Sequence, residues 1–516
     1  MTLRHAHRFN VILTVLVCLT FAGCLDTESA SERAAPSSRQ LLIVLDGLRP
    51  DYVTPQLMPA LNALGARGVV MTRHHAVFPT VTRVNASSIS TGAYPEAHGL
   101  MGNSVFFPSV EPGQFLNTSD RANLLRVEAD GASLLTATTL AEVLEAGGQR
   151  LLVASSGSSG SAYLLNHTGA GGGILHYEYG VPEALHTDAL ARLGPVPDAA
   201  TPNHARNRWI VDAFLDVALP EVDPAVTILW LSDPDTTAHQ HGIGHPVTVE
   251  ALFRLDAEID RLQGRLDEAG LLETTNIWVT SDHGFSEHTG SVDLTALLSP
   301  FADVLADGSP RIVAGAGAIY VRDNDRETIA AIVAALQAEE GVGAVFTEAT
   351  NPGADEGGYE GWVPGTLSFD LARWSHQRAA QILYSADWSN DVGEYGFLGT
   401  SAQAGVAGHG SASPFDIQNT LVAAGPDLKV GVRIASPTGN VDFAPTFLHL
   451  QGLAAPPAMQ GRVLREALRD EGGAGPVAAE MTEITVESAD GSYTLTAIVS
   501  AADGRSYLDY TTVQRR

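Results

Sequence analysis

Acidic residues and histidines recur along this 516-residue sequence beside short runs that are expected to form strands. Asp46 directly follows the run at 41–45, and His409 lies in a loop of small residues before the run at 420–424. The residues concerned are Asp46, Asp235, His239, Asp282, His283 and His409. Singly, each has a simpler explanation as a turn residue, a helix cap or a hydrogen-bonded loop residue. Together, three carboxylates and three imidazoles form a candidate ligand set for two zinc ions, which accept oxygen and nitrogen donors in near-tetrahedral sites.

A hydroxyl residue, Thr82, stands where a nucleophile would be useful. A proline-led turn at 78–81 brings Thr82 to the start of a segment, 86–90, that is expected to be helical. Free backbone N–H groups and the helix dipole favour an anion at that point, which suits attack on phosphate. The alternative is that Thr82 only caps the helix.

The elements that must position these residues are apolar or β-rich runs at 41–45, 151–154, 226–231, 277–280 and 420–424. Helical patterns occupy 134–144, 208–219 and 249–269 between them. This alternation predicts an α/β fold with a mostly parallel central sheet flanked by helices. In such a sheet the ligand crevice lies at the carboxyl ends of the strands.

Four segments are predicted from composition and pattern. Residues 40–470 form the main domain, and an insert at about 300–400 carries a β-α-β pattern that could roof the site. Residues 471–516 alternate as strands and form a small C-terminal β appendage. Residues 1–23 and 24–39 are a signal peptide and a flexible tether.

The first 23 residues resemble a bacterial lipoprotein signal, which places a lipid on Cys24 and attaches the chain to a membrane. An exported lipoprotein of the periplasm or outer membrane is expected, with Leu25 favouring the outer membrane. A conventional cleaved signal and secretion are the alternative. The other cysteine, Cys18, lies within the signal, so the mature chain would contain no internal disulfide.

The charge balance restricts the partners. With 59 acidic and 30 basic residues the net charge is −29, so a nucleic-acid polymer is excluded as a partner. An anionic small molecule would need local positive charge, which bound metal ions supply.

From residue 41 to about 464 the chain resembles the nucleotide pyrophosphatase/phosphodiesterase family of the alkaline phosphatase superfamily. The matching segments are Asp46-Gly47-Leu48-Arg49-Pro50, the Thr82 segment, Tyr94-Pro95-Glu96-Ala97-His98-Gly99, Asp235 with His239, Asp282-His283 and His409-Gly410. Asn103 also follows Thr82 by 21 positions, the interval that separates nucleophile and oxyanion-stabilising Asn in the family. His241 lies near these segments without matching a ligand position.

The resemblance implies an α/β alkaline phosphatase-like enzyme with two zinc ions. One zinc is implied on Asp235, His239 and His409, and the other on Asp46, Asp282 and His283. Thr82 would bridge toward the second zinc as nucleophile and form a phospho-threonine, while Asn103 would donate to a phosphoryl oxygen. The implied activity is hydrolysis of phosphodiester or pyrophosphate bonds in small phosphate esters.

The substrate-binding prediction rests on Arg83 and Tyr163. Residues 155–163 contain no Lys or Arg that could clamp a doubly charged monoester, which favours a diester or pyrophosphate. Nucleotide-cleaving relatives typically have a base-stacking Phe where this chain has Arg83, which could bind a second phosphate, bind a monoester or face solvent. Tyr163, Tyr177 and Tyr179 are candidate replacement stacking surfaces, or ordinary core aromatics.

Other functions remain as alternatives. A phosphate monoesterase on the same scaffold is the first. A sulfatase is less favoured, because Thr82 is followed by Arg83-Val84-Asn85-Ala86 and lacks the Pro and Arg spacing of sulfatases. A non-catalytic binding protein is least favoured, because the nucleophile and every implied ligand are present.

Overall fold

The computed structural model describes residues 38–350, 358–469 and 477–516. The predicted signal peptide, Cys24 and most of the predicted tether lie outside the described residues. In the described part of the chain, every helix is too short or too polar to cross a membrane.

The central sheet has ten strands and is mostly parallel, as the sequence predicts. Five neighbouring strands run parallel to one another, and β19 is antiparallel to both of its neighbours, β9 and β2. The order is β20 (Val432–Ile434), β2 (Val69–His75), β19 (Gln418–Ala424), β9 (Thr275–Thr280), β1 (Arg39–Leu45), β8 (Val226–Leu231), β5 (Leu151–Ser155), β6 (Gly173–His176) and β7 (Gly180–Val181), with β21 (Thr438–Gly439) beside β2.

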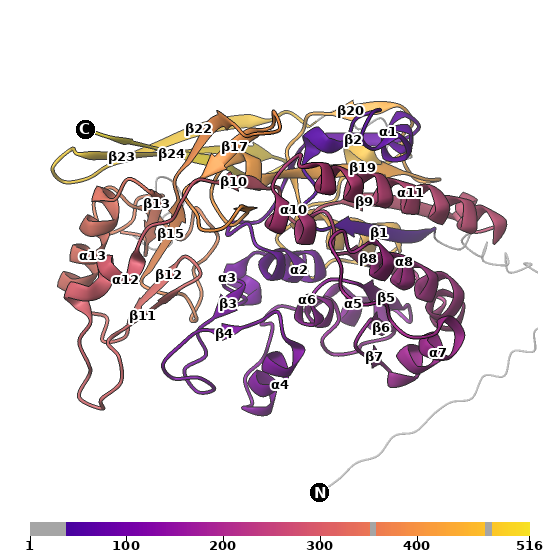
Figure 1. Cartoon of the computed structure of the whole chain (residues 1–516), viewed down its shortest axis with the longest axis horizontal. Coiled ribbons are helices and arrows are strands. Elements are labelled where there is room, and N and C mark those ends of the chain that lie inside the picture. The colour runs from indigo at the N-terminus through magenta and orange to yellow at the C-terminus, as the bar shows by residue number, and fades with distance from the viewer. Residues whose placement is uncertain (1–37, 351–357, 470–476) are drawn as a thin grey trace, which may run out of the picture. The chain divides into compact units, whose positions relative to one another are not determined.

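Helices cover both faces of this sheet (Figure 1). Successive side chains of β1 alternate between two hydrophobic clusters, with Leu42 and Val44 in one and Leu41, Ile43 and Leu45 in the other. The first cluster contains residues of α2 (Thr82–Thr91), α5 (Leu140–Ala146), α6 (Ser159–Leu165) and α15 (Phe443–Leu450). The second contains residues of α1 (Pro59–Ala66), α7 (Glu183–Leu193), α8 (His204–Ala213) and α11 (Pro246–Glu268).

Several helix predictions differ from the structure at their ends, and the helices expected at 249–269 and 86–90 both begin earlier, at Pro246 and Thr82. The helix expected at 134–144 begins only at Leu140, because Thr139 and Glu142 form a reciprocal capping box that fixes the start. The helix expected at 208–219 is longer and irregular: α8 continues into a π-helical segment, Phe214–Ala218, and then α9 (Leu219–Val222).

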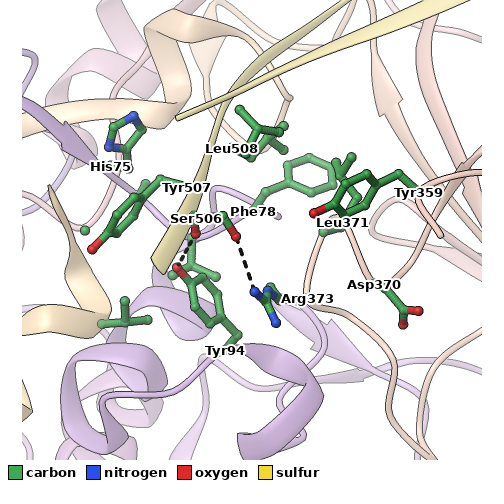
Figure 2. Close-up of a pocket in the computed structure, with 16 residues that line it drawn as sticks. His75, Phe78, Tyr94, Tyr359, Asp370, Leu371, Arg373, Ser506, Tyr507 and Leu508 are labelled. Carbon is green, nitrogen blue, oxygen red and sulfur yellow. Dashed lines mark hydrogen bonds between the residues drawn. The ribbon is translucent and has the colours of Figure 1, made fainter. Parts of the chain in front are cut away.

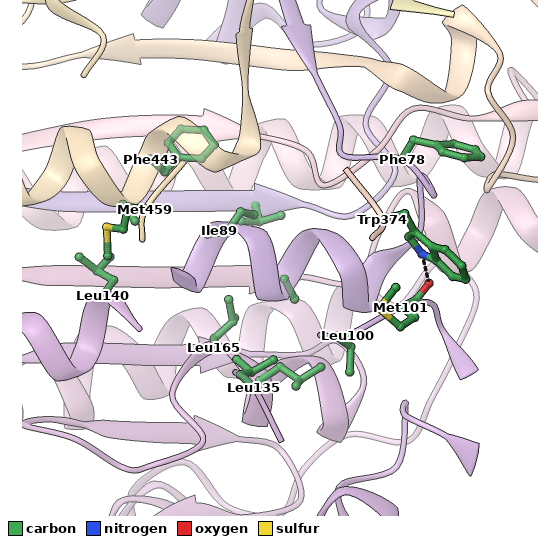
Figure 3. Packing of buried hydrophobic residues seen from close by; sticks show 14 of the residues in the cluster. Phe78, Ile89, Leu100, Met101, Leu135, Leu140, Leu165, Trp374, Phe443 and Met459 are labelled. Atoms are coloured by element: carbon green, nitrogen blue, oxygen red, sulfur yellow. Dashed lines mark hydrogen bonds between the residues drawn. The ribbon is translucent and has the colours of Figure 1, made fainter. Parts of the chain in front are cut away.

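The helix that begins at Thr82 is buried along nearly its whole length. Ile89 is fully buried within the first hydrophobic cluster, which also holds Phe443 and Met459 from the far end of the chain (Figure 3). In the same cluster the Nε1–H of Trp374 donates to the carbonyl of Met101 at 3.0 Å. This packing fixes the position of α2.

The insert forms its own sheet and hydrophobic core. Its order is β11 (Ile312–Gly315), β12 (Ala318–Val321), β15 (Ile382–Ala386), β13 (Val342–Thr347) and β14 (Leu367–Ser368), with α12 (Leu294–Leu298) and α13 (Arg326–Ala338) packed on it. The predicted β-α-β unit corresponds to β12, α13 and β13. A strand from later in the chain, β15, lies between its two strands and is antiparallel to both.

The remaining elements are a small sheet, a strand pair and several short helices. A four-stranded sheet has the order β16 (Trp388–Val392), β17 (Leu398–Ser401), β10 (Ser286–His288) and β18 (Ala407–Gly408), and β3 (Ser104–Val105) pairs with β4 (Leu116–Asn117). The short helices are α3 (Pro95–His98), α4 (Arg121–Ala129), α10 (Asp235–His241) and α14 (Pro414–Ile417).

The C-terminal segment is a three-stranded sheet of β22 (Glu480–Glu487), β23 (Tyr493–Ala502) and β24 (Arg505–Arg515). The sequence pattern indicates the first two strands, and β24 is a third. It contacts the main domain through polar pairs. Asp509 accepts from His75 Nε2 at 2.9 Å, and the Tyr507 hydroxyl donates to Asp442 at 2.9 Å. A cavity of about 160 Å³ lies between β24, Arg373 and the end of β2 (Figure 2), and it contains none of the predicted site residues.

Candidate active site

The sequence-predicted ligands meet at the carboxyl ends of the parallel strands. Asp46 follows β1, Asp235 begins α10 just after β8, and Asp282 with His283 follows β9. Because β1 and β8 are neighbours, the backbone N–H of Asp235 donates to the Asp46 carbonyl at 2.9 Å. His409 arrives from outside the central sheet, directly after β18.

One cluster consists of Asp235, His239 and His409. Asp235 Oδ1 lies 3.2 Å from His239 Nε2 and 3.4 Å from His409 Nε2. Asp235 and His239 are four residues apart on α10, so their side chains share one helix face. The His239 side chain is 42% exposed, so this cluster opens to solvent.

The other cluster, Asp46, Asp282 and His283, is buried. His283 Nε2 lies 3.1 Å from Asp282 Oδ2 and 3.6 Å from Asp46 Oδ1. The rings of His283 and His409 stack with their centroids 3.4 Å apart, so the two clusters adjoin.

All three histidines are held in the same tautomer. Nδ1 of His239 lies 2.8 Å from the Ala407 carbonyl, that of His283 lies 3.0 Å from the Gly284 carbonyl, and that of His409 lies 2.8 Å from the Thr80 carbonyl. A carbonyl only accepts, so each Nδ1 carries the hydrogen and each neutral ring keeps its lone pair on Nε2. This is the arrangement expected of metal-ligating histidines, whose second ring nitrogen donates to the protein.

The carboxylates show the complementary feature. One oxygen of each is buried without a hydrogen-bond partner in the described structure: Asp46 Oδ1, Asp235 Oδ1 and Asp282 Oδ2. By contrast, Asp46 Oδ2 accepts from Trp230 Nε1 at 2.9 Å, and Asp282 Oδ1 accepts from the Gly47 N–H at 3.1 Å. Buried carboxylate oxygens are costly unless they are paired or bind a metal, so this donor set fits two divalent cations.

Burial and the charges of neighbouring groups shift the pKa values of these residues. Burial, followed by the charges of Asp282 and Asp235, raises the pKa of Asp46 well above its usual value. Burial, with the neighbouring His283, lowers the pKa of His409 to about 4. A bound cation favours the ionised carboxylate and the neutral imidazole alike.

Thr82 lies beside the buried cluster. It is the first residue of α2, whereas Val81 occupies the N-cap position and no side chain caps the helix, so the capping interpretation of Thr82 is wrong. Thr82 Oγ1 lies 3.3 Å from His283 Nε2. Since His283 Nδ1 carries the hydrogen, the Thr82 hydroxyl is the donor in this pair.

Asn103 is oriented by the residue that follows Thr82. Its Oδ1 accepts the backbone N–H of Arg83 at 3.0 Å. The amide nitrogen of Asn103 makes no hydrogen bond to any described residue, and it can therefore donate to a ligand beside Thr82. The fold therefore brings Asn103 next to the residue that follows Thr82.

Two residues that the sequence did not indicate stabilise the turn at 78–81 that precedes Thr82. The Thr80 hydroxyl donates to the Ser411 carbonyl at 2.8 Å and accepts from the Gly410 N–H, so the turn and the His409 loop are joined. Asn85 Oδ1 accepts from the Val77 N–H at 2.7 Å and closes the turn from the other side. Both lie in the segment around Thr82, but only the fold reveals their partners.

Two cavities border the centre. The Arg83 cavity has a volume of about 390 Å³ and is lined by Asp46, Thr82, Arg83, Tyr177, Asp235 and eleven further residues that include Arg206. The insert cavity has a volume of about 320 Å³ and is lined by Asn103, His409, Gly317, Tyr384 and other small or neutral residues.

The tyrosines differ in their relation to the Arg83 cavity. Tyr163 is not among the lining residues, and its hydroxyl donates to Glu128 at 2.8 Å. Tyr179 is not among them either, and its hydroxyl donates to the Ser159 carbonyl. Tyr177 does line the cavity. His241 stacks on His245 with ring centroids 5.0 Å apart and belongs to neither candidate metal cluster.

Comparison with known proteins finds one matching family model and several relatives. The model of the type I phosphodiesterase / nucleotide pyrophosphatase family matches residues 40–399, which include every predicted ligand except His409. Ectonucleotide pyrophosphatase/phosphodiesterase family member 1 of Rattus norvegicus is 26% identical over 250 residues, covering 48% of this chain and 24% of the relative.

Further relatives show the same level of similarity. The venom phosphodiesterase of Macrovipera lebetinus is 27% identical over 268 residues, covering 50% of this chain and 27% of the relative. The bis(5'-adenosyl)-triphosphatase ENPP4 of Bos taurus is 26% identical over 317 residues, covering 58% of this chain and 59% of the relative. The chain thus spans between about a quarter and three fifths of the length of these relatives.

Substitution of Gly47 by Ala tests how closely the two clusters are packed. Gly47 has φ +73°, and a Cβ there would lie 3.0 Å from the Phe285 ring and 3.1 Å from Asp235 Cβ. The matched control, Gly270→Ala, has φ +68° and nothing within 4 Å of the new Cβ. We expect the control to lose about 1 kcal/mol of unfolding free energy in urea and Gly47→Ala at least about 1 kcal/mol more. Equal losses of unfolding free energy in the two variants would show that Phe285 and Asp235 move to accommodate the added methyl group without destabilising the protein.

Proposed function

Because this chain belongs to the type I phosphodiesterase / nucleotide pyrophosphatase family, we propose that it hydrolyses phosphodiester or pyrophosphate bonds of small molecules with two zinc ions and a Thr82 nucleophile. The alternative on the same scaffold is a phosphate monoesterase. The observation that carries the proposal is the position of the Thr82 hydroxyl beside His283, next to three carboxylate oxygens that lack hydrogen-bond partners.

Asp235, His239 and His409 would hold one ion, and Asp46, Asp282 and His283 the other. When bound, zinc would offset the charge of the phosphate and lower the pKa of a coordinated hydroxyl. The histidine tautomers are set for this role by their carbonyl partners, so no histidine in either cluster remains available as a general base.

The covalent step belongs to Thr82. Its oxygen attacks phosphorus, the Oγ–P bond forms, and the P–O bond to the leaving arm breaks as that arm departs with a proton as an alcohol or a phosphate. The Asn103 amide donates to a non-bridging oxygen, an orientation supported by the Arg83 N–H on its Oδ1. Water then attacks phosphorus, its oxygen stays on the released phosphate ester, and one of its protons returns to Thr82 Oγ1 as the bond to Thr82 breaks.

Two cavities at one reacting centre favour a diester. A diester or pyrophosphate has two arms, and the Arg83 cavity and the insert cavity provide room for one each. A monoester has one arm and would leave one cavity unused. The net charge of −29 excludes a nucleic-acid polymer, so a small phosphate ester is the proposed substrate class.

The place of action is proposed from sequence alone. The lipoprotein-type signal at 1–23 and the lipid acceptor Cys24 favour an exported protein attached to a membrane, with secretion as the alternative. These residues lie outside the described structure, and the same holds for most of the proposed tether.

Replacement of the nucleophile tests the reaction. With zinc-loaded protein, we expect higher kcat/KM for bis(4-nitrophenyl) phosphate than for 4-nitrophenyl phosphate. Thr82→Ala should lower the diester value by at least about a thousand-fold, because the attacking oxygen is removed, whereas Thr82→Ser should retain part of it. Thr274→Ala, an exposed threonine on the 3₁₀ turn before β9, is the matched control and should match the parent. Preference for the monoester, or activity that survives in Thr82→Ala, would overturn the proposal.

Removal of one proposed ligand tests the metal assignment. After exhaustive dialysis we expect about two zinc ions per chain by elemental analysis, and about one in His409→Ala, because a tetrahedral site loses affinity with each protein ligand. His241→Ala is the matched control, since it removes a nearby imidazole that lies in neither cluster. The assignment fails if His409→Ala keeps the full zinc content or if the control loses as much.

A further inference from the structure

The Arg83 cavity is polar and carries positive charge. Besides the residues of the reacting centre, its walls include Ser156, Ser158, Asn203 and Gln240, together with the guanidinium groups of Arg83 and Arg206. A cavity with this lining suits oxygen-rich, anionic groups better than an apolar or purely aromatic group.

Arg83 is the group in this wall that lacks a partner. Its Nε is buried without a hydrogen bond, and its guanidinium forms no ion pair with a described residue. The carboxylates that act on it electrostatically are Asp46, Asp235 and Asp282, the ligands of the candidate metal clusters. Cations on those carboxylates would leave the half-buried Arg83 side chain without a counter-charge, which favours the binding of an anion.

Arg206 supplies a second cation on the same cavity. Its Nε and Nη2 donate to the Pro197 carbonyl at 3.4 and 3.2 Å, and its Cζ lies 4.1 Å from the centre of the Tyr177 ring. The guanidinium is therefore fixed in place, while its Nη1 makes no hydrogen bond within the described residues. A fixed guanidinium loses less freedom when it binds a carboxylate or phosphate.

The same contacts disfavour base stacking in this cavity. Tyr177 is the single aromatic residue among the cavity's lining residues. Its ring contacts the Arg206 guanidinium, and the His176 ring lies 4.1 Å away, centroid to centroid. A planar ligand that stacked on Tyr177 would compete with the Arg206 guanidinium for the ring.

We propose that the arm of the substrate held in the Arg83 cavity carries a second anionic oxygen group, a carboxylate or a phosphate, which Arg83 and Arg206 bind. The inference rests on the proposed function for the reacting centre and adds the substrate class to it. Arg83 acts as the specificity-determining residue, because its backbone is tied to Asn103 and it lines the cavity together with Thr82.

The test compares three 4-nitrophenyl phosphodiesters that share one leaving group and differ in the second arm: phenyl, 4-carboxyphenyl and 4-phosphonophenyl. For the zinc-loaded chain we expect kcat/KM to be at least about ten-fold higher with a charged arm than with phenyl, since hydrogen bonds to charged groups are worth that factor. The carboxylate and phosphonate arms decide which anion is preferred. In Arg83→Gln the ratio of charged to uncharged arm should fall to near one.

A matched substitution and a second measurement make the result decisive. Arg208→Gln removes an arginine two positions along α8 from Arg206 that pairs with Glu258 and does not line the cavity, and its ratio should equal that of the parent. Binding of 4-carboxyphenyl phosphate and phenyl phosphate to Thr82→Ala protein, measured by calorimetry, should show the same ten-fold difference without turnover and lose it when Arg83→Gln is added.

The outcomes separate this inference from the proposed function. If all three diesters are cleaved equally well, or if Arg83→Gln lowers every rate by one factor, the inference is overturned and Arg83 instead holds the reacting phosphate or makes no contact with the substrate. If no diester is cleaved but calorimetry retains the Arg83-dependent preference, the inference stands and the proposed reaction fails.

Discussion

Three buried carboxylate oxygens without a hydrogen-bond donor are the constraint on which the site depends. Asp46, Asp235 and Asp282 lie close together, and like charges at such short range oppose one another and raise the cost of burial. Nearby, His239, His283 and His409 present Nε2 lone pairs rather than hydrogens, because their Nδ1 atoms donate to carbonyls. Divalent cations satisfy both kinds of ligand at once.

The surrounding structure serves to keep these groups in place. The parallel register of β1 with β8 aligns Val44 with Trp230, and the indole of Trp230 donates to Asp46 at the strand end. Thr80 joins the turn at 78–81 to the His409 loop, so the proposed nucleophile and a proposed ligand from outside the central sheet share one set of hydrogen bonds. Burial of α2 against both early and late segments of the chain then fixes Thr82.

Much of this arrangement was predictable from sequence, for identifiable reasons. Continuous apolar runs predict the central strands. Asp46 could be identified as a site candidate because the first run ends directly in Asp-Gly. Features that depend on contacts between distant segments could not be predicted. The hydrogen bond from Trp230 to Asp46 depends on the register of two strands. The position of β15 between β12 and β13 depends on where a later part of the chain pairs with the insert. The positions of the tyrosines are of the same kind, since Tyr177, directly after β6, lines the Arg83 cavity, whereas the hydroxyl of Tyr163 in α6 donates to Glu128.

We propose that six residues form two metal sites beside one nucleophile, Thr82. Anomalous diffraction at the zinc edge, from crystals of the zinc-loaded full chain, tests this arrangement. We expect two peaks, one bounded by Asp235, His239 and His409 and the other by Asp46, Asp282 and His283, both beside Thr82. A single peak, or peaks at residues outside these two clusters, would contradict it.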